Sequence, residues 1–197
     1  MNDPRPGLKA GSVLLDDDAR VSPAALLAIA HMPTGNLSAL VADGFWRQLS
    51  DADFMRIAVL LAQKSFDEGG CPIGAVIIDN RKRCIVGKGH NTLVQENHPY
   101  NHGETAAIRD AGRINFRRTT LFTSLSPCEI CASLLQMRGF GRVVVGDVSN
   151  ASGTEARLRE HGIQVDILED AAGVSLYRRF RSEQPALERE DWLGRSD

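Results

Sequence analysis

Two short motifs in the middle of the chain have side chains and spacing suited to holding a metal ion and moving a proton. His102 and Glu104 form an H-x-E motif, and Pro127, Cys128 and Cys131 belong to a P-C-x-x-C motif. One histidine nitrogen and two cysteine sulfurs, with water in the fourth position, are the ligand set of a catalytic zinc site. Such a site lowers the pKa of its water to about 7. Glu104 is then placed to take the proton of this water and pass it on.

Two helix N-termini are expected to bring these motifs together. Cys128 and Cys131 are three residues apart, so their sulfurs share one face of the first turn if Pro127 is the first residue of a helix. A helix N-terminus favours negative charge and so helps both thiols to bind a metal as thiolates. The apolar spacing of residues 104–113 predicts a second helix, whose N-terminus would present His102 to the two sulfurs.

A C-x-x-C motif alone is also typical of a redox pair or of half of a structural zinc site. A structural site needs a fourth ligand, but Cys71 and Cys84 each lie at the edge of an apolar segment, where an inert buried thiol is the usual case. His98 is within range, but Pro99 argues against a helix face shared with the H-x-E motif. Because Glu104 has little purpose in a structural site, a catalytic metal site is the favoured interpretation.

Length and composition indicate a soluble globular chain. It has 197 residues, of which 43% are hydrophobic and 24% charged, and its net charge of −2 argues against a broad nucleic-acid surface. Four cysteines, two of them in the metal motif, do not make a disulfide framework. The apolar run 24–30 is too short to span a bilayer and lacks the flanks of a signal peptide. We therefore expect a cytoplasmic protein that binds neither membrane nor nucleic acid.

The chain is expected to consist of an N-terminal extension, residues 1–50, and one domain, residues 51–197. The extension is predicted to be partly helical, at 24–30 and near 37–49, and to be a structural cover or a substrate lid. The domain begins at an S-x-x-D capping box, Ser50 to Asp53. The hydrophobic pattern predicts strands at 75–78, 84–89, 119–124, 142–146 and 163–168, with helices at 54–66, 104–112, 127–138, 154–161 and 171–181.

The order of these elements predicts an α/β fold. The first two strands form a hairpin, and crossover helices make the last three strands parallel. The expected architecture is a three-layer α/β/α sandwich with a five-stranded mixed sheet, whose site lies at strand and helix ends.

From about residue 54 to residue 192 the chain resembles the zinc-dependent cytosine deaminase superfamily, and within it the fungal-type enzymes that act on the free base. The H-x-E and P-C-x-x-C pair is the signature of zinc nucleobase deaminases. Glycine between His102 and Glu104 is informative, because the tRNA adenosine and guanine deaminases of the superfamily usually have alanine there. Further matching motifs are E-G-G-x-P-I-G at 68–74, G-x-G-H-N at 87–91, L-S-P-C at 125–128, V-V-G at 144–146 and D-W at 191–192.

This resemblance implies a cytidine deaminase-like fold, a homodimer and a metal site. His102, Cys128 and Cys131 would hold one Zn²⁺ per chain, and Glu104 would be the catalytic proton shuttle. The reaction would be hydrolytic deamination of a small molecule.

The resemblance also implies four substrate contacts. Asn91 would hydrogen-bond the amide edge of the ring, and the backbone N–H of Gly103 would add a second contact. The carbonyl of Ser126 would receive the leaving amine, and Trp192 would close over the base.

Two positions depart from the fungal pattern. Ala151 stands where those enzymes have an aromatic wall, and Arg195 stands where they have an acidic residue, a role that Asp197 would take if the tail were shifted. Both changes bear on which ring is bound. The first candidate reaction is cytosine to uracil plus ammonia. The alternatives are deamination of isocytosine, guanine, a pterin, a triazine or creatinine, or a non-catalytic zinc-stabilised binding protein, against which Glu104 argues.

Overall fold

The protein, described from a computed structural model over residues 21–37 and 45–194, has the predicted α/β fold. Five strands form one sheet in the order β2-β1-β3-β4-β5. β1 pairs antiparallel with β2 and β3, whereas β3, β4 and β5 run parallel, as the hairpin and crossover helices predicted. The strands are β1 Gly74–Asp79, β2 Ile85–His90, β3 Thr119–Thr123, β4 Arg142–Val145 and β5 Gln164–Ile167.

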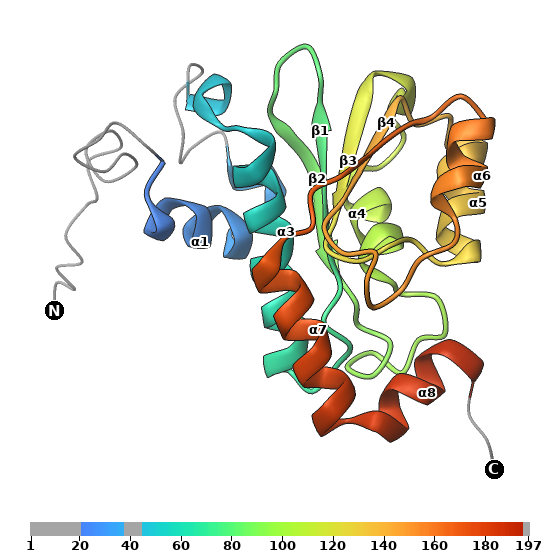
Figure 1. Ribbon diagram of the computed structural model, residues 1–197. Coiled ribbons are helices and arrows are strands. Elements are labelled where there is room, and N and C mark those ends of the chain that lie inside the picture. Colours follow the sequence, from blue (N-terminus) through green and yellow to red (C-terminus); the bar gives the residue numbers. More distant parts are fainter. Residues whose placement is uncertain (1–20, 38–44, 195–197) are drawn as a thin grey trace, which may run out of the picture.

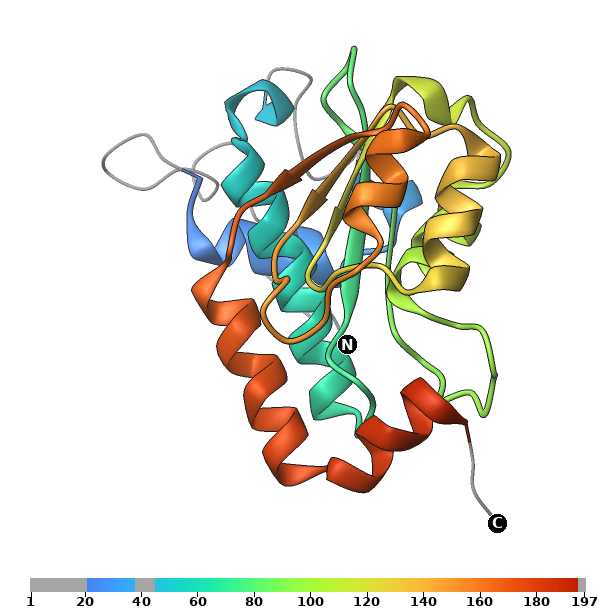
Figure 2. The same ribbon diagram turned by 45° about the vertical axis from the view of Figure 1, so that its right-hand side comes forward.

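Helices cover both faces of the sheet, which makes three layers (Figure 1). α1, α3 and α7 lie on one side, and α4, α5 and α6 lie on the other, an arrangement that the turned view also shows (Figure 2). The helices are α1 Pro23–His31, α3 Asp51–Asp67, α4 Gly103–Ala111, α5 Glu129–Arg138, α6 Glu155–Glu160, α7 Ala171–Glu183 and α8 Pro185–Leu193. Short 3-10 turns cover Thr34–Asn36, Phe45–Gln48 and Phe116–Arg118.

The alternation of side chains along the strands explains why the sheet is buried on both faces. In β1, Val76 and Ile78 pack with the helices α1 and α3. Ala75 and Ile77, which alternate with these two residues along the strand, pack with α4, α5 and α6 on the opposite face. Successive residues of a strand point to opposite faces, so a strand between two helical layers must be apolar throughout.

The predicted capping box begins α3 and is confirmed. The Ser50 side chain accepts a hydrogen bond from the Asp53 N–H at 3.3 Å, and the Asp53 carboxylate accepts one from the Ser50 N–H at 2.7 Å. Two N–H groups that a helix leaves without partners are thereby satisfied.

Glycines in β2 let α4 approach the sheet closely. A Cβ atom on Gly87 would lie 2.4 Å from the Ala107 carbonyl oxygen, and one on Gly89 would lie 2.5 Å from the Ala106 side chain. Real side chains do not fit at such distances, so glycine is required at both positions. This contact fixes the helix that carries the H-x-E motif against the edge strand.

The helix with the two cysteines begins two residues later than predicted. The expectation that Pro127 is its first residue is wrong, because Cys128 is extended (φ −70°, ψ 172°) and is the N-cap of α5. The Cys128 carbonyl accepts the first helical hydrogen bond, from the Ala132 N–H at 2.8 Å. The carbonyl of Pro127, the residue before this cap, accepts a hydrogen bond from the Thr154 hydroxyl at 2.8 Å instead.

Two further elements differ from the sequence prediction. The helix α8 was not predicted, although Pro185 at its first turn is a common helix start. The helix predicted near 37–49 falls partly outside the described residues, and the described part at Phe45–Gln48 is a 3-10 turn.

α1 packs Leu26 and Ile29 into the core beside α3. Within the described ranges, no helix is long and apolar enough to cross a membrane.

Candidate active site

The structure brings His102, Cys128 and Cys131 together at two facing helix N-termini. His102 is the N-cap of α4, Cys128 is the N-cap of α5, and Cys131 lies in the first turn of α5. The His102 Nδ1 atom is 3.4 Å from the Cys128 sulfur and 3.5 Å from the Cys131 sulfur. The starts of α4 and α5 therefore place the side chains of the two sequence motifs in one compact group of donor atoms.

The spacing of these three donor atoms fits a tetrahedral zinc ion. Zinc bonds of about 2.3 Å to sulfur and about 2.0 Å to nitrogen give a nitrogen–sulfur edge of about 3.5 Å at the tetrahedral angle. The observed separations of 3.4 and 3.5 Å match this edge. Among the described residues, these three form the one group of metal-ligand side chains whose donor atoms lie within 4.8 Å of one another. Hydrogen bonding from Cys131 lowers the pKa of Cys128 to about 4, so this sulfur is a thiolate at neutral pH.

Glu104 lies directly beside the three donor atoms, in the first turn of α4. Its side chain is 3% exposed, and burial raises the pKa of its carboxyl group. One carboxyl oxygen accepts a hydrogen bond from the Thr123 hydroxyl at 3.2 Å, and the other is 3.5 Å from the Cys131 sulfur. Glu104 is therefore held in place from the end of β3, and its carboxyl group can carry a proton next to the three donor atoms.

A small cavity of about 30 Å³ lies over this cluster. It is the inner end of a wider groove of about 700 Å³, because both are lined by Leu93, His102, Cys128, Asp191 and Trp192. The walls of the inner cavity come from the loop before β1, from the loops after β2 and β3, and from the helices α4 and α8. The groove thus gives access to Glu104 and to the three donor atoms together. The inner cavity is lined by Cys71, Ile73, Asn91, Leu93, His102, Glu104, Leu125, Ser126, Cys128, Asp191 and Trp192.

Asn91 presents a hydrogen-bond donor to the cavity. Its side chain is 1% exposed, and its Oδ1 atom accepts from the Leu93 N–H at 3.0 Å. Its backbone is fixed as well, because the N–H donates to the Ile73 carbonyl at 2.8 Å. The side-chain NH₂ group has no hydrogen bond to the described residues, so it is available to a bound molecule.

The three other predicted substrate contacts occupy different positions. Ser126 lines the cavity, and its N–H is bound to the Asp147 carbonyl at 2.9 Å. Trp192 forms part of the opposite wall, with its ring N–H donating to the Tyr177 hydroxyl at 2.9 Å. Gly103 is buried at the start of α4 and is not part of the cavity lining; a Cβ atom there would lie 3.0 Å from the Ile73 carbonyl oxygen.

Asp191 is a residue of the site that the sequence patterns did not predict. It lines the cavity beside Trp192, and its Oδ2 atom is buried without a hydrogen-bond partner among the described residues. Burial raises the pKa of this carboxyl group, and the buried thiol of Cys71 beside it opposes the rise. The D-W motif contained the signal, but the resemblance assigned a role only to its tryptophan.

Of the two departures from the fungal pattern, only Ala151 falls within the described residues, and it is not part of the cavity lining. Ala151 packs against the small core cluster of Cys71, Leu125, Tyr177 and Phe180, next to the cavity. Arg195 and Asp197 lie outside the described residues.

Comparison with known proteins agrees with this geometry. Residues 49–147 match the profile of the cytidine and deoxycytidylate deaminase zinc-binding region. Cytosine deaminase from Candida albicans is 37% identical over 145 residues, which cover 72% of this chain and 93% of that protein. A tRNA-specific adenosine deaminase from Buchnera aphidicola is 35% identical over 100 residues, or 49% of this chain and 65% of that protein.

A solved structure shares the fold. Guanine deaminase from Nitrosomonas europaea superimposes with a TM-score of 0.60 at 17% identity, over 68% of this chain and 85% of that one. The fold and the sequence matches together define a hydrolytic deaminase that acts on a carbon–nitrogen bond. The chain belongs to the cytosine deaminase superfamily and resembles its fungal type most closely in its motifs.

Proposed function

We propose that this protein is a zinc-dependent hydrolytic deaminase of a free nucleobase, with cytosine to uracil plus ammonia as the first candidate reaction. One observation carries the proposal: the buried carboxyl group of Glu104 lies against three metal-ligand side chains at the inner end of a groove. The similarity to cytosine deaminase from Candida albicans supports the choice of base.

His102, Cys128 and Cys131 would hold the zinc ion, whose chemistry is to polarise a water molecule and lower its pKa to about 7. Glu104 would accept the proton of the attacking water at a carboxylate oxygen. It would then donate that proton to the ring nitrogen beside the amino-bearing carbon. The hydroxyl group now on that carbon would give its proton to Glu104, which would pass it to the amino group, so that the C–N bond breaks, the carbonyl forms and ammonia leaves.

Two side chains in the cavity would select the edge of the ring. The Asn91 NH₂ group is a donor, and the Asp191 Oδ2 atom is an acceptor, and both are without partners among the described residues. This pair complements a ring carbonyl next to a ring N–H. Cytosine offers such an edge, whereas cytidine carries its sugar on the nitrogen in question. A buried acceptor that loses its donor costs roughly 1–3 kcal/mol, so the pair favours the free base over the nucleoside.

A larger amino-heterocycle such as guanine is the second candidate. Guanine also has a carbonyl beside a ring N–H. In the core next to the cavity, Ala151 stands in the place of the aromatic wall of the fungal enzymes. Isocytosine, a pterin, a triazine and creatinine differ from cytosine in ring size or in the placement of this edge. The homodimer, the cytoplasmic location and the absence of nucleic-acid binding stay predictions.

The proposal is tested by ammonia release from the zinc-loaded protein with cytosine, 1-methylcytosine, cytidine, isocytosine, guanine, a pterin, a triazine and creatinine. We expect turnover of cytosine and at least tenfold lower kcat/KM for 1-methylcytosine and cytidine, which lack the ring N–H. Turnover of guanine without turnover of cytosine would favour the second candidate. Equal turnover of cytosine and cytidine would contradict recognition of the free base.

A further inference from the structure

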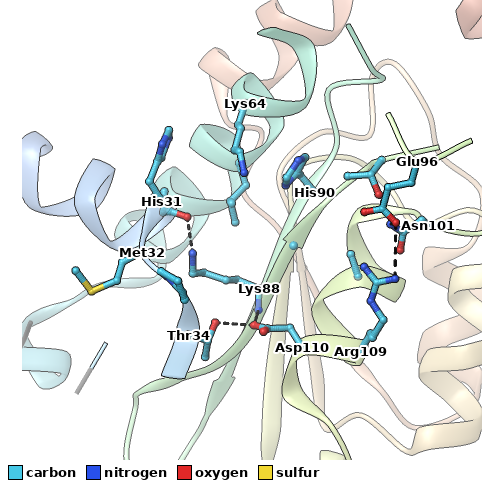
Figure 3. Close-up of a pocket in the computed structure, with 16 residues that line it drawn as sticks. His31, Met32, Thr34, Lys64, Lys88, His90, Glu96, Asn101, Arg109 and Asp110 are labelled. Carbon is cyan, nitrogen blue, oxygen red and sulfur yellow. Dashed lines mark hydrogen bonds and ion pairs between the residues drawn. The ribbon is translucent and has the colours of Figure 1, made fainter. Parts of the chain in front are cut away.

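A second cavity, of about 350 Å³, lies between the N-terminal segment and the edge of the sheet. Residues 30–34 form one wall, and β2, α3, α4 and the loop after β2 form the others (Figure 3). It shares no lining residue with the inner cavity of the active site. Cavities of this size accommodate small metabolites, and polar side chains in their walls decide which ones.

Three basic side chains are directed toward the space inside this cavity. Lys64 comes from α3, and Lys88 and His90 come from β2 (Figure 3). The Lys88 ammonium group donates one hydrogen bond, to the Ala30 carbonyl. No carboxylate of the described residues lies within ion-pairing distance of it, so its other N–H groups are left for a ligand.

The surroundings of Lys88 oppose its positive charge. Burial lowers the pKa of Lys88 to about 8 and the charge of Lys64 acts in the same direction, although Asp110 works against them. Burial also lowers the pKa of His90, and Lys64 again contributes. Like charges held close together in a partly buried site are stabilised by an anion between them.

Two acidic groups, Asp110 and Glu68, lie near the three basic side chains. One oxygen of Asp110 accepts hydrogen bonds from the Thr34 hydroxyl and from the Lys88 backbone N–H, the latter at 2.9 Å. Glu68, which is not part of the lining, lies 3.0 Å from the His90 ring and 3.7 Å from the Lys64 ammonium group, so it is shared by these two basic side chains.

Glu96, the remaining acidic residue of the lining, faces the opposite end of the cavity. It accepts a hydrogen bond from the Asn101 side chain at 3.1 Å and lies 4.0 Å from the Arg109 guanidinium group. Among the described residues, Lys88 is thus the lysine of the lining that has no carboxylate within ion-pairing distance, whereas Lys64 has Glu68.

We propose that this cavity binds a small oxyanion, the phosphate or carboxylate group of a metabolite, between Lys64 and Lys88 with His90 beside it. Ammonium groups form charge-assisted hydrogen bonds with such oxygens, and Lys88 retains donors for them. The volume leaves room for an attached group of about nucleotide size.

The experiment is titration calorimetry of the zinc-loaded full chain with inorganic phosphate, uridine monophosphate and acetate. We expect saturable binding of one or more of these anions, and the comparison of acetate with the phosphates identifies the preferred oxyanion. Lys88→Met and Lys64→Met should each weaken the binding about tenfold or more. Lys82→Met, in the exposed turn between β1 and β2, is the matched control and should leave the affinity unchanged.

Two variants are needed because Lys88 also binds a carbonyl of the last turn of α1, so its loss can loosen that helix. Lys64 makes no contact of this kind, and far-UV circular dichroism shows whether either variant has lost helix. Unchanged affinity in Lys64→Met and Lys88→Met would overturn the proposal. Absence of saturable binding of all three anions by the unmodified protein would overturn it as well.

Discussion

The two cavities lie back to back and are built from different parts of the chain. Asn91 and His102 line the candidate active site. The residues that precede them, His90 and Asn101, line the second cavity, which is bounded by residues 30–34 and is called the oxyanion cavity below. The active site is formed mostly by residues 49–147, the region that matches the family. The oxyanion cavity takes one wall from residues 30–34, upstream of that region. This cavity therefore depends on a segment that lies outside the residues matched by the family profile.

The two cavities also differ in how their charges are arranged. In the active site, the reactive groups lie within hydrogen-bonding distance of one another, as Glu104 and Cys131 do at 3.5 Å. In the oxyanion cavity, Lys64 and Lys88 repel each other across an open space. The first arrangement suits the proposed chemistry on a small ring, and the second suits the proposed binding of an anion. Substitutions in one cavity should therefore leave the role of the other intact.

The largest expected effect is at Glu104. Glu104→Gln should lower kcat for the preferred base by about 10³-fold, because the proton shuttle is lost while the shape of the site is kept. Zinc content, measured by atomic absorption, should not change. Glu183→Gln, which breaks an exposed ion pair with Arg179, is the control and should leave kcat unchanged. Activity of Glu104→Gln close to that of the unmodified protein would show that the proton is moved by another group.

Asp191→Asn should have the next largest effect, again confined to the active site. In this variant an NH₂ group can face the ring N–H in place of the carboxylate oxygen, so the site loses its acceptor. The kcat/KM for the free base should therefore fall by about 10- to 100-fold. The discrimination between cytosine and 1-methylcytosine should fall with it, which a merely structural role of Asp191 would not cause. If the two substrates kept their original ratio, Asp191 would not contact the ring.

The sequence predicted those parts of the fold and site that depend on short-range patterns. Alternating or continuous apolar residues identified all five strands, and the Ser50–Asp53 pattern identified the start of α3. The H-x-E and P-C-x-x-C motifs predicted the group that the structure brings together, because each motif lies at the start of a single helix.

Other features depend on contacts between distant parts of the chain and were not predicted. The start of α5 is set by the hydrogen bond from Thr154 to the Pro127 carbonyl, over 27 positions of sequence. Asp191 becomes a wall of the active site only because α8 folds across the groove. The oxyanion cavity requires residues 30–34 to close over β2, and no local pattern encodes that closure.

Oxyanion binding should depend on pH in a way that turnover at the active site does not share. Lys88 has a pKa of about 8, so it loses its charge as the pH rises through this value, and the dissociation constant should then increase by up to about tenfold per pH unit. Lys88→Arg keeps a charged side chain and should remove this dependence. Titration calorimetry between pH 7 and pH 10 measures both, and a dependence that persisted in Lys88→Arg would rule out Lys88 as its source. Other charged groups around the cavity are His31, Lys64, Glu68, His90, Glu96, Arg109 and Asp110.

The smallest effect is expected where neither cavity is involved. Ser50→Ala removes the side-chain acceptor for the Asp53 N–H at the start of α3. The free energy of unfolding should fall by about 1 kcal/mol, as measured by urea denaturation. Ser182→Ala, at an exposed position of α7, is the control with no cap to lose. A loss of catalytic activity in Ser50→Ala without a loss of stability would contradict a purely structural role for this cap.

The most direct test of the proposed function is a zinc titration of the metal-free protein, followed by ammonia release from cytosine. The proposed function predicts no turnover without metal and an increase proportional to added zinc that ends at about one ion per chain. Cys131→Ser should show little or no increase over the same range. Full turnover by the metal-free protein, or binding of one zinc ion without turnover of any amino-heterocycle, would contradict it.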